Sequence, residues 1–404
     1  MRMREPVAER RSRLLPVLIL AMAMAPLVSY SASALSPRLV AEFHTTSAQY
    51  GLFATVSFLS GALFSRLVAT ASDRLSDRTQ IGVIFGFAVV SLIILAYATN
   101  FAWFLVAAFV SGPSHALCNP FTNRMIVRRV SPDLRGRWMG IKQAGVQLSQ
   151  AFAGLVLPLA ASILGWRLSL GILACTCLFL LLSSVRQTAQ VEKTSPSTAA
   201  VDFDFVTKPT VSYSPKAVRL LATYALLSGT GVQATNVYTP LFSQKELGFS
   251  FVSSGLTVAV AGGIGLCARI YWGRLMATSV SAGIMMRIAA LAASLGAACL
   301  AAAGVFQSGA LLWVGIVLHG ATALGSNVIV MSSVLRYVPA RRAGSASAVV
   351  GMAMYLGFAM GPLLISAILA FNGDIAVGWL TVAIIYLIAA LVSRTNELGR
   401  IGPQ

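Results

Sequence analysis

Long apolar segments follow one another along nearly the whole chain, separated by short polar intervals. Each is close to the ~20 residues that an α-helix needs to cross ~30 Å of hydrocarbon. The pattern predicts twelve membrane-spanning helices, near residues 14–35, 50–71, 80–98, 101–123, 138–163, 166–185, 217–240, 250–271, 281–304, 309–330, 345–370 and 377–393. The longest polar interval, 187–215, is rich in Ser, Thr, Pro and charged residues, as flexible linkers are. We therefore expect an all-α membrane protein with six-helix bundles at 1–186 and 216–404.

The first apolar segment has a second interpretation. Five arginines precede it, and Ser-Ala-Ser-Ala at 31–34 resembles a signal-peptidase site. The apolar run is nevertheless long enough to span a membrane, and it pairs with the seventh segment in the internal repeat described below. We therefore interpret it as the first spanning helix.

The composition agrees with a membrane protein: 57% of the residues are hydrophobic and only 10% are charged, against about a quarter charged in soluble domains. The net charge of +18 is explained by the distribution of basic residues between the two sides of the membrane. With cytoplasmic termini, 24 of the 30 basic residues fall in cytoplasmic intervals or tails and three in the opposite intervals. Because positive residues mark the cytoplasmic side, we expect both ends inside a cell membrane, such as a bacterial inner membrane, and no nucleic-acid partner.

The two halves share residues at constant offsets. A shift of 204 pairs Gly51 with Gly255, and a shift of 208 pairs Asn119 with Asn327. Two parallel six-helix halves related by an axis along the membrane normal are a known architecture of secondary transporters. We therefore expect the twelve helices to form two pseudo-symmetric bundles.

The interval after the second segment carries a recognisable motif, running from Ala69 to Arg78 as Ala-Thr-Ala-Ser-Asp-Arg-Leu-Ser-Asp-Arg. It resembles the signature of the major facilitator superfamily: Gly, three residues, Asp-Arg, any residue, Gly, then basic residues. Asp73, Arg74 and Arg78 match, whereas Ala69 and Ser76 replace the glycines. Together with the helix count and the central linker, the resemblance covers nearly the whole chain. It implies a monomeric secondary transporter for a small molecule, with a coupling ion left open and the lipid bilayer around it.

The resemblance also implies a conformational latch at the cytoplasmic face. Asp73 would meet the N-terminus of the eleventh helix near Gly344, where free N–H groups favour an anion. Arg74, Arg78 and Arg128 would join it and hold the cytoplasmic side shut in the outward-open state. The alternative interpretation is a solvated loop acid that only aids topology.

Polar side chains form stripes on four predicted helices. On the fifth helix Gln143, Gln147 and Gln150 are spaced i, i+4, i+7 and share one face. The fourth, seventh and tenth helices carry similar groups, namely His115, Asn119 and Thr122; Gln233 and Asn236; and His319, Thr322, Ser326 and Asn327. The resemblance implies that these helices line or adjoin a central cavity, so we predict that the stripes bind substrate. Hydrogen-bonded contacts between helices are the alternative.

The charged residues suggest the sign of the solute. All twelve acidic residues fall in predicted loops or tails, whereas Arg66, Lys142 and Arg287 lie within helices. Ionisable groups inside a membrane are costly and usually functional, so cations without buried acids favour an anionic solute. Lys142, beside the glutamine stripe, is the leading candidate for contacting the anion, and Arg66 is a second. The alternative for each cation is that its side chain reaches the membrane interface.

We therefore predict a secondary active transporter of a small organic anion, working by rocker-switch alternating access. Efflux of lipophilic drug-like compounds is the alternative; Met- and Phe-rich helices support it, and the absence of a Gly-Pro pair in the fifth helix weakens it. A receptor that binds without transport would normally carry a signalling extension. An enzyme is not expected, because the sequence has no nucleotide loop and no Ser/His/Asp arrangement. The five cysteines lack metal-binding spacing, so we expect no metal and no cofactor.

Overall fold

The computed structural model describes residues 7–71, 75–194, 215–276, 278, 280–338 and 340–394. This part of the chain is helical and contains no strand. Ten stretches of it are long and apolar enough to cross a membrane. Two further helices, α4 (Leu52–Ala71) and α10 (Pro215–Lys245), bring the spans to twelve. The all-α fold with twelve membrane-spanning helices is thus confirmed.

The spans follow the predicted order along the chain. The first six are α1 (Val7–Ala34), α4, α5 (Asp77–Tyr97), α6 (Phe101–Val110) continued by α7 (Gly112–Arg129), α8 (Pro132–Leu164) and α9 (Trp166–Thr194). The last six are α10, α11 (Phe251–Met276), α12 (Ala282–Val305), α13 (Gly309–Leu318) continued by η1 (His319–Ala323) and α14 (Ser326–Tyr337), α15 (Ala340–Asn372) and α16 (Ile375–Val392). The short helices α2 (Ser36–Glu42) and α3 (Ser47–Tyr50) connect α1 to α4. Helix α9 continues past residue 186, where we expected the linker to begin.

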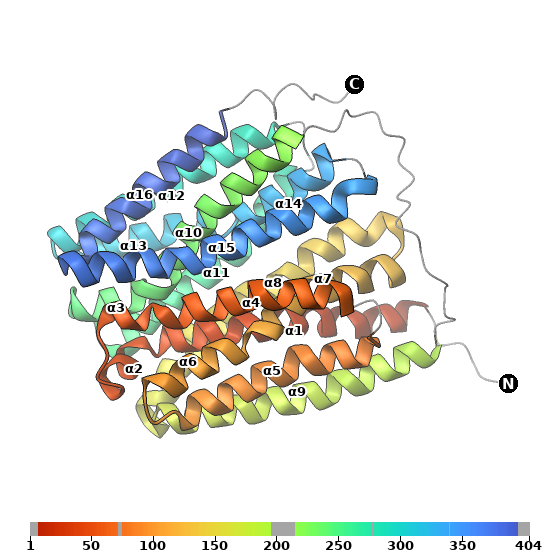
Figure 1. The fold of residues 1–404 in the computed structure, drawn as a ribbon, viewed down its shortest axis with the longest axis horizontal. Coiled ribbons are helices and arrows are strands. Elements are labelled where there is room, and N and C mark those ends of the chain that lie inside the picture. The colour runs from red at the N-terminus through yellow and green to blue at the C-terminus, as the bar shows by residue number, and fades with distance from the viewer. Residues whose placement is uncertain are drawn as a thin grey trace.

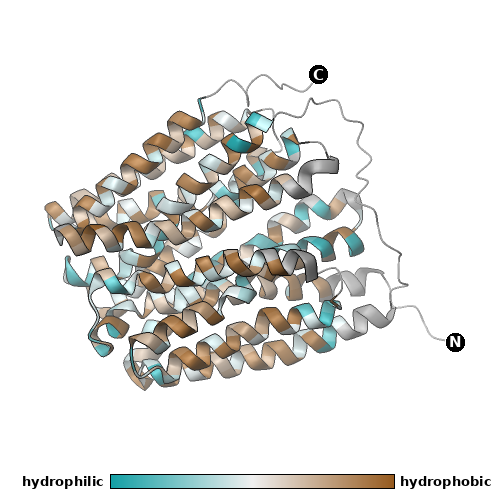
Figure 2. Cartoon of the chain, in the orientation of Figure 1, coloured by the Kyte–Doolittle hydropathy of each residue, from teal (hydrophilic) through white to brown (hydrophobic). Residues whose placement is uncertain are grey.

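Apolar side chains cover the outside of both bundles, and hydrophilic residues gather at the ends and between the bundles (Figure 2). Leu63, Phe179 and Leu295 are 60%, 69% and 58% exposed. Large apolar side chains so exposed are typical of a surface that faces lipid rather than water. The chain is therefore a multi-pass membrane protein.

The fourth and tenth spans are interrupted at matching positions. Helix α6 begins after Asn100, whose side chain caps it by accepting from the Trp103 N–H at 3.2 Å. Helix α13 begins after Ser308, 208 residues later, with the same kind of cap. Helix α6 ends at Val110 and is followed by the turn residue Ser111; α13 gives way to the π-helical turn η1 at His319, 208 residues after Ser111. The internal repeat therefore extends to local irregularities of the backbone.

The halves formed by α1–α9 and α10–α16 lie side by side and separate toward one end (Figure 1). We call the end that carries α2 and α3 the α2–α3 end, and the opposite end the termini end. At the α2–α3 end, Tyr238 of α10 donates to the Ser47 carbonyl at 3.1 Å, and Lys245 donates to the Ser47 hydroxyl at 3.1 Å. The Arg38 guanidinium lies 5.1 Å from the Phe251 ring centre. These contacts join the two halves at this end.

Small residues allow the two halves to approach closely where α8 crosses α11. A Cβ at Gly154 would overlap the backbone nitrogen of Ala259, and one at Gly255 would overlap the Pro158 ring. A Cβ at Gly262 would lie 2.5 Å from the backbone nitrogen of Ala151. Glycine at such crossings is typical of membrane helices, because close packing drives their association.

The described residues cover only part of the predicted latch. Asp73 and Arg74 lie outside them. Arg78 lies in the first turn of α5, and Arg128 is exposed in the last turn of α7. The neighbouring acid Asp77 is buried and pairs with Arg129 at 2.7 Å, within the first half. The latch between halves stays a prediction.

Candidate functional site

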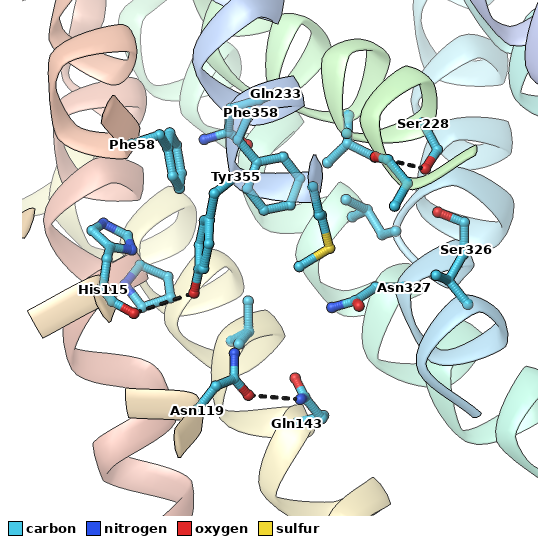
Figure 3. Close-up of a pocket in the computed structure, with 18 of the residues that line it drawn as sticks. Phe58, His115, Asn119, Gln143, Ser228, Gln233, Ser326, Asn327, Tyr355 and Phe358 are labelled. Carbon is cyan, nitrogen blue, oxygen red and sulfur yellow. Dashed lines mark hydrogen bonds between the residues drawn. The ribbon is translucent and has the colours of Figure 1, made fainter. Parts of the chain in front are cut away.

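A central cavity lies between the two halves (Figure 3). From the first half it is lined by residues of α1, α4, α7 and α8, and from the second half by residues of α10, α11, η1, α14 and α15, including the η1–α14 junction. Six of the predicted binding residues are in the lining: His115, Asn119, Gln143, Gln233, Ser326 and Asn327. The polar stripes of four different helices therefore meet at one cavity.

One wall of the cavity carries amides and a guanidinium. Gln143 of α8 donates to the Asn119 Oδ1 of α7 at 3.2 Å. Arg269 of α11 donates through Nη1 to the Gln143 carbonyl at 3.0 Å and to its Oε1 at 3.3 Å. The Arg269 Nε donates to the Leu324 carbonyl at 3.2 Å. The guanidinium is thus held in a fixed orientation at the junction of the two halves, and the residue is only 9% exposed.

Lys142 is placed differently from our expectation. Its side chain neither reaches the membrane interface nor lines the cavity; it is 1% exposed. The ammonium donates to Thr122 Oγ1 at 2.8 Å, to Asn119 Oδ1 at 3.4 Å and to Asn123 Oδ1. Lys142 therefore lies behind Asn119 and orients that amide, because the nearest acceptors all belong to α7.

A second polar cluster adjoins the central cavity through Gln233. Asn236 Oδ1 accepts from Gln150 at 3.1 Å and lies 3.1 Å from His319 Nε2. Gln147 donates to Gln150 at 3.3 Å, and Asn236 donates to Gln233 at 3.3 Å. These side chains are buried. The structure therefore places the predicted residues Gln147, Asn236 and His319 in a hydrogen-bonded network that crosses between the halves.

The opposite wall of the cavity is aromatic. Phe58 of α4 and Phe358 of α15 have ring centres 5.1 Å apart, and Tyr355 lies 6.0 Å from Phe358. The Tyr355 hydroxyl donates to the His115 carbonyl at 3.2 Å, and the His115 ring packs 4.9 Å from Phe58. Figure 3 shows these rings together, with Asn119 and Gln143 below them and Asn327 to one side. The cavity therefore has one polar, cationic wall and one aromatic wall.

Sequence comparison agrees with this architecture. The family model of the Major Facilitator Superfamily matches residues 18–362. The chain belongs to the major facilitator superfamily. No curated protein sequence is similar enough to count as a relative.

Solved structures with the same fold include other major facilitators. A D-xylose-proton symporter gives a TM-score of 0.78 at 14% identity, covering 95% of this chain and 97% of that one. A bacterial homolog of the human lysosomal transporter Spinster, in an inward-facing and unoccupied conformation, gives 0.71 at 17% identity, covering 98% and 99%. Its inward-facing, occupied form gives 0.68 at 16% identity. At these identities the likeness shows the fold alone, and the fold is that of a membrane transporter.

Two features of this major facilitator's site were missed from the sequence. Arg269 was counted with the cytoplasmic cations although it lies within the predicted helix 250–271, because it is only two residues from the predicted end; α11 continues to Met276. Its spacing from Gly262 and Gly265 puts it on the face that packs against α8, which was the available signal. The aromatic wall gave no signal, because Phe58 and Phe358 resemble any apolar residue of a spanning helix. The side chain of Arg66, in α4, lies outside the described part of the chain.

Proposed function

We propose that this transporter carries a small organic anion. The observation that carries the proposal is the placement of Arg269. Among the cavity-lining residues that the structure describes, it alone has a formal charge. A buried cation without a counter-charge is costly in a low-dielectric site. An anionic solute would supply the missing counter-charge, whereas a cationic solute would add to the cost.

The hydrogen bonds around Arg269 support a binding role. They use Nε and Nη1, and the described residues leave Nη2 without a hydrogen bond. An Arg guanidinium has five N–H donors in a planar fork that matches a carboxylate. Arg269 therefore retains donors that a solute carboxylate would accept.

We propose rocker-switch alternating access as the mechanism, with units at 1–186 and 216–404 moving on the linker 187–215. In support, direct contacts join the halves at the α2–α3 end, and the ribbons separate toward the termini end (Figure 1). With both termini in the cytoplasm, as the positive residues predict, this structure corresponds to an inward-facing state. Transport would then require the α2–α3 end to open and the termini end to close in a monomer.

The first experiment is a thermal-shift measurement on the purified transporter. The probes are acetate, lactate and benzoate, compared with neutral benzyl alcohol and cationic benzylamine. A ligand at 100 times its Kd stabilises the fold by about 2.7 kcal/mol, which such an assay resolves. We expect at least one acid to raise the melting temperature and then to be taken up by proteoliposomes. Stabilisation by benzylamine and by none of the acids would refute the proposal and support the alternative, efflux of lipophilic compounds.

A charge substitution tests the role of Arg269 directly. Arg269→Gln removes the charge and keeps an amide donor. We expect the affinity for the acid, measured from the thermal shift, to fall about 10- to 100-fold, as for loss of a charged hydrogen bond. Arg274→Gln is the matched control, because Arg274 is exposed in the last turn of the same helix. Equal acid affinity in the two variants would remove Arg269 from the site.

A further inference from the structure

The two walls of the cavity differ in chemistry, and together they describe the shape of a ligand. We infer that the solute is an amphiphilic carboxylate, with its carboxylate on the wall of Arg269 and Asn327 and an aromatic or bulky apolar body on the wall of Phe58, Tyr355 and Phe358. This inference rests on the proposed function, because it assumes that the cavity binds an anion. It adds the class of anion.

The carboxylate end is defined by two neighbouring groups of the second half. The Arg269 Nε donates to the carbonyl of Leu324, which places the guanidinium beside the segment that leads into α14. Asn327, three residues further along the chain, lines the cavity, and its Oδ1 is buried without a hydrogen-bond partner among the described residues. A buried amide without a partner costs free energy. A carboxylate would accept from the free Arg269 Nη2–H and from the Asn327 Nδ2–H. The buried Asn327 Oδ1 is itself an acceptor, so it would take its hydrogen bond from a different donor, such as water or a hydroxyl of the solute.

The apolar end is defined by ring faces. The hydroxyl of Tyr355 is engaged by the His115 carbonyl. Tyr355 lines the cavity together with Phe58 and Phe358. The three rings are mutually packed, at 5.1 Å between Phe58 and Phe358 and 6.3 Å between Phe58 and Tyr355. Such a cluster offers stacking and edge contacts to another ring.

The same arrangement disfavours other anions. A dicarboxylate bound at Arg269 would direct its second carboxylate toward the aromatic wall, and the described lining offers no second cation there. A small acid such as acetate would leave the aromatic wall in contact with water. Because burying apolar surface is favourable in proportion to its area, an apolar body on the carboxylate adds affinity that small acids lack.

Three related compounds separate the contributions of the two walls: 3-phenylpropionate, propionate and 3-phenylpropanol. Binding to the full-length transporter in detergent is measured by thermal shift over a range of concentrations. We expect 3-phenylpropionate to bind at least about tenfold more tightly than either propionate or 3-phenylpropanol. In Arg269→Gln the preference for the acid over the alcohol should be lost. In Phe358→Leu the preference for the phenyl acid over propionate should shrink several-fold, while the acid is still preferred over the alcohol.

The outcomes distinguish this inference from the proposed function. If propionate and 3-phenylpropionate bind equally well, the amphiphile is refuted and the anion transporter stands. If 3-phenylpropanol binds as tightly as the acid in the unchanged protein, both fail. If Arg269→Gln does not fold, Arg269→Lys provides a second test of the role of the charge. Because it keeps the positive charge, it should retain the preference for the acid over the alcohol. The Arg274→Gln control should match the unchanged protein in every comparison.

Discussion

The glycine packing between α8 and α11 allows a sharp test of alternating access. Gly154 of α8 lies where the two halves meet, toward the α2–α3 end. A Cβ added at this position would lie 2.7 Å from the Gly255 carbonyl oxygen and 2.8 Å from the Val258 Cβ, and it would overlap the Ala259 nitrogen. Two of these three atoms belong to the α11 backbone and cannot rotate away. Gly154→Ala should therefore push the halves apart at this end.

The expected magnitude follows from the cost of overpacking. Adding a methyl group to a tightly packed contact costs about 1–3 kcal/mol. If the contact exists only while the α2–α3 end is closed, the substitution destabilises that state alone. The ratio of the two states then shifts by about 5- to 150-fold, so a minor state near 1% would become readily detectable.

Distance measurement between spin labels provides the assay. Ile163 at the end of α8 and Phe306 beyond α12 are 81% and 73% exposed and belong to different halves. Labels at Ile163→Cys and Phe306→Cys, in a background without the native cysteines, report the opening of the α2–α3 end. We expect Gly154→Ala to add a longer distance to the distribution.

A matched control lies on the partner helix. A Cβ at Gly263 would have no other atom within 4 Å, so Gly263→Ala should leave the distance distribution unchanged. Gly255→Ala, which would meet the Pro158 ring from the other side of the crossing, should act like Gly154→Ala. Identical distributions in all three variants would refute the rocker-switch assignment of this contact.

Two further substitutions test the charged contacts. Lys142→Ala should lower the free energy of unfolding by about 2–4 kcal/mol, because it empties a buried site and removes a donor from the Asn119 and Thr122 oxygens. Loss of anion affinity at unchanged thermal stability would instead place Lys142 in contact with solute. Asp77→Asn should cost about 2 kcal/mol, since it removes the buried carboxylate that pairs with the half-buried Arg129. Glu42→Gln breaks a pair whose side chains are 44% and 41% exposed, so it should cost less than about 1 kcal/mol. Equal melting temperatures for the Asp77 and Glu42 variants would contradict the role of burial.

The apolar segments and their order were predictable from the sequence, because the thickness of a bilayer fixes the length of a spanning helix. The placement of polar stripes was predictable in part. His115, Asn119 and Gln143 line the cavity as expected. The other two glutamines of the fifth helix do not line this cavity. Gln147 and Gln150 belong to the second cluster. Spacing along one helix shows which residues share a face, and it does not show which partner that face meets.

The cations illustrate the same limit. Lys142 was correctly placed within a helix, but its acceptors on α7 are about 20 residues away in sequence and come together only in the folded protein. Arg269 was counted with the cytoplasmic cations because it lies near the end of the predicted helix, whereas α11 continues to Met276. Helix ends are the least certain part of any pattern, since the last turns of a spanning helix lie in the polar headgroup region.

The π-helical turn η1 determines how α14, the part of the tenth span that follows it, is rotated about the helix axis. A π turn holds one more residue than an α-helical turn, and one residue corresponds to about 100° of rotation about the helix axis. Deleting a single residue from His319–Ala323 would therefore turn α14 by about 100° and withdraw Asn327 from the cavity. The fourth span has a turn at Ser111 at the matching place. The polar faces of the two related spans are thus set by their local irregularities, so an insertion or deletion there would redirect the site without changing one of its residues.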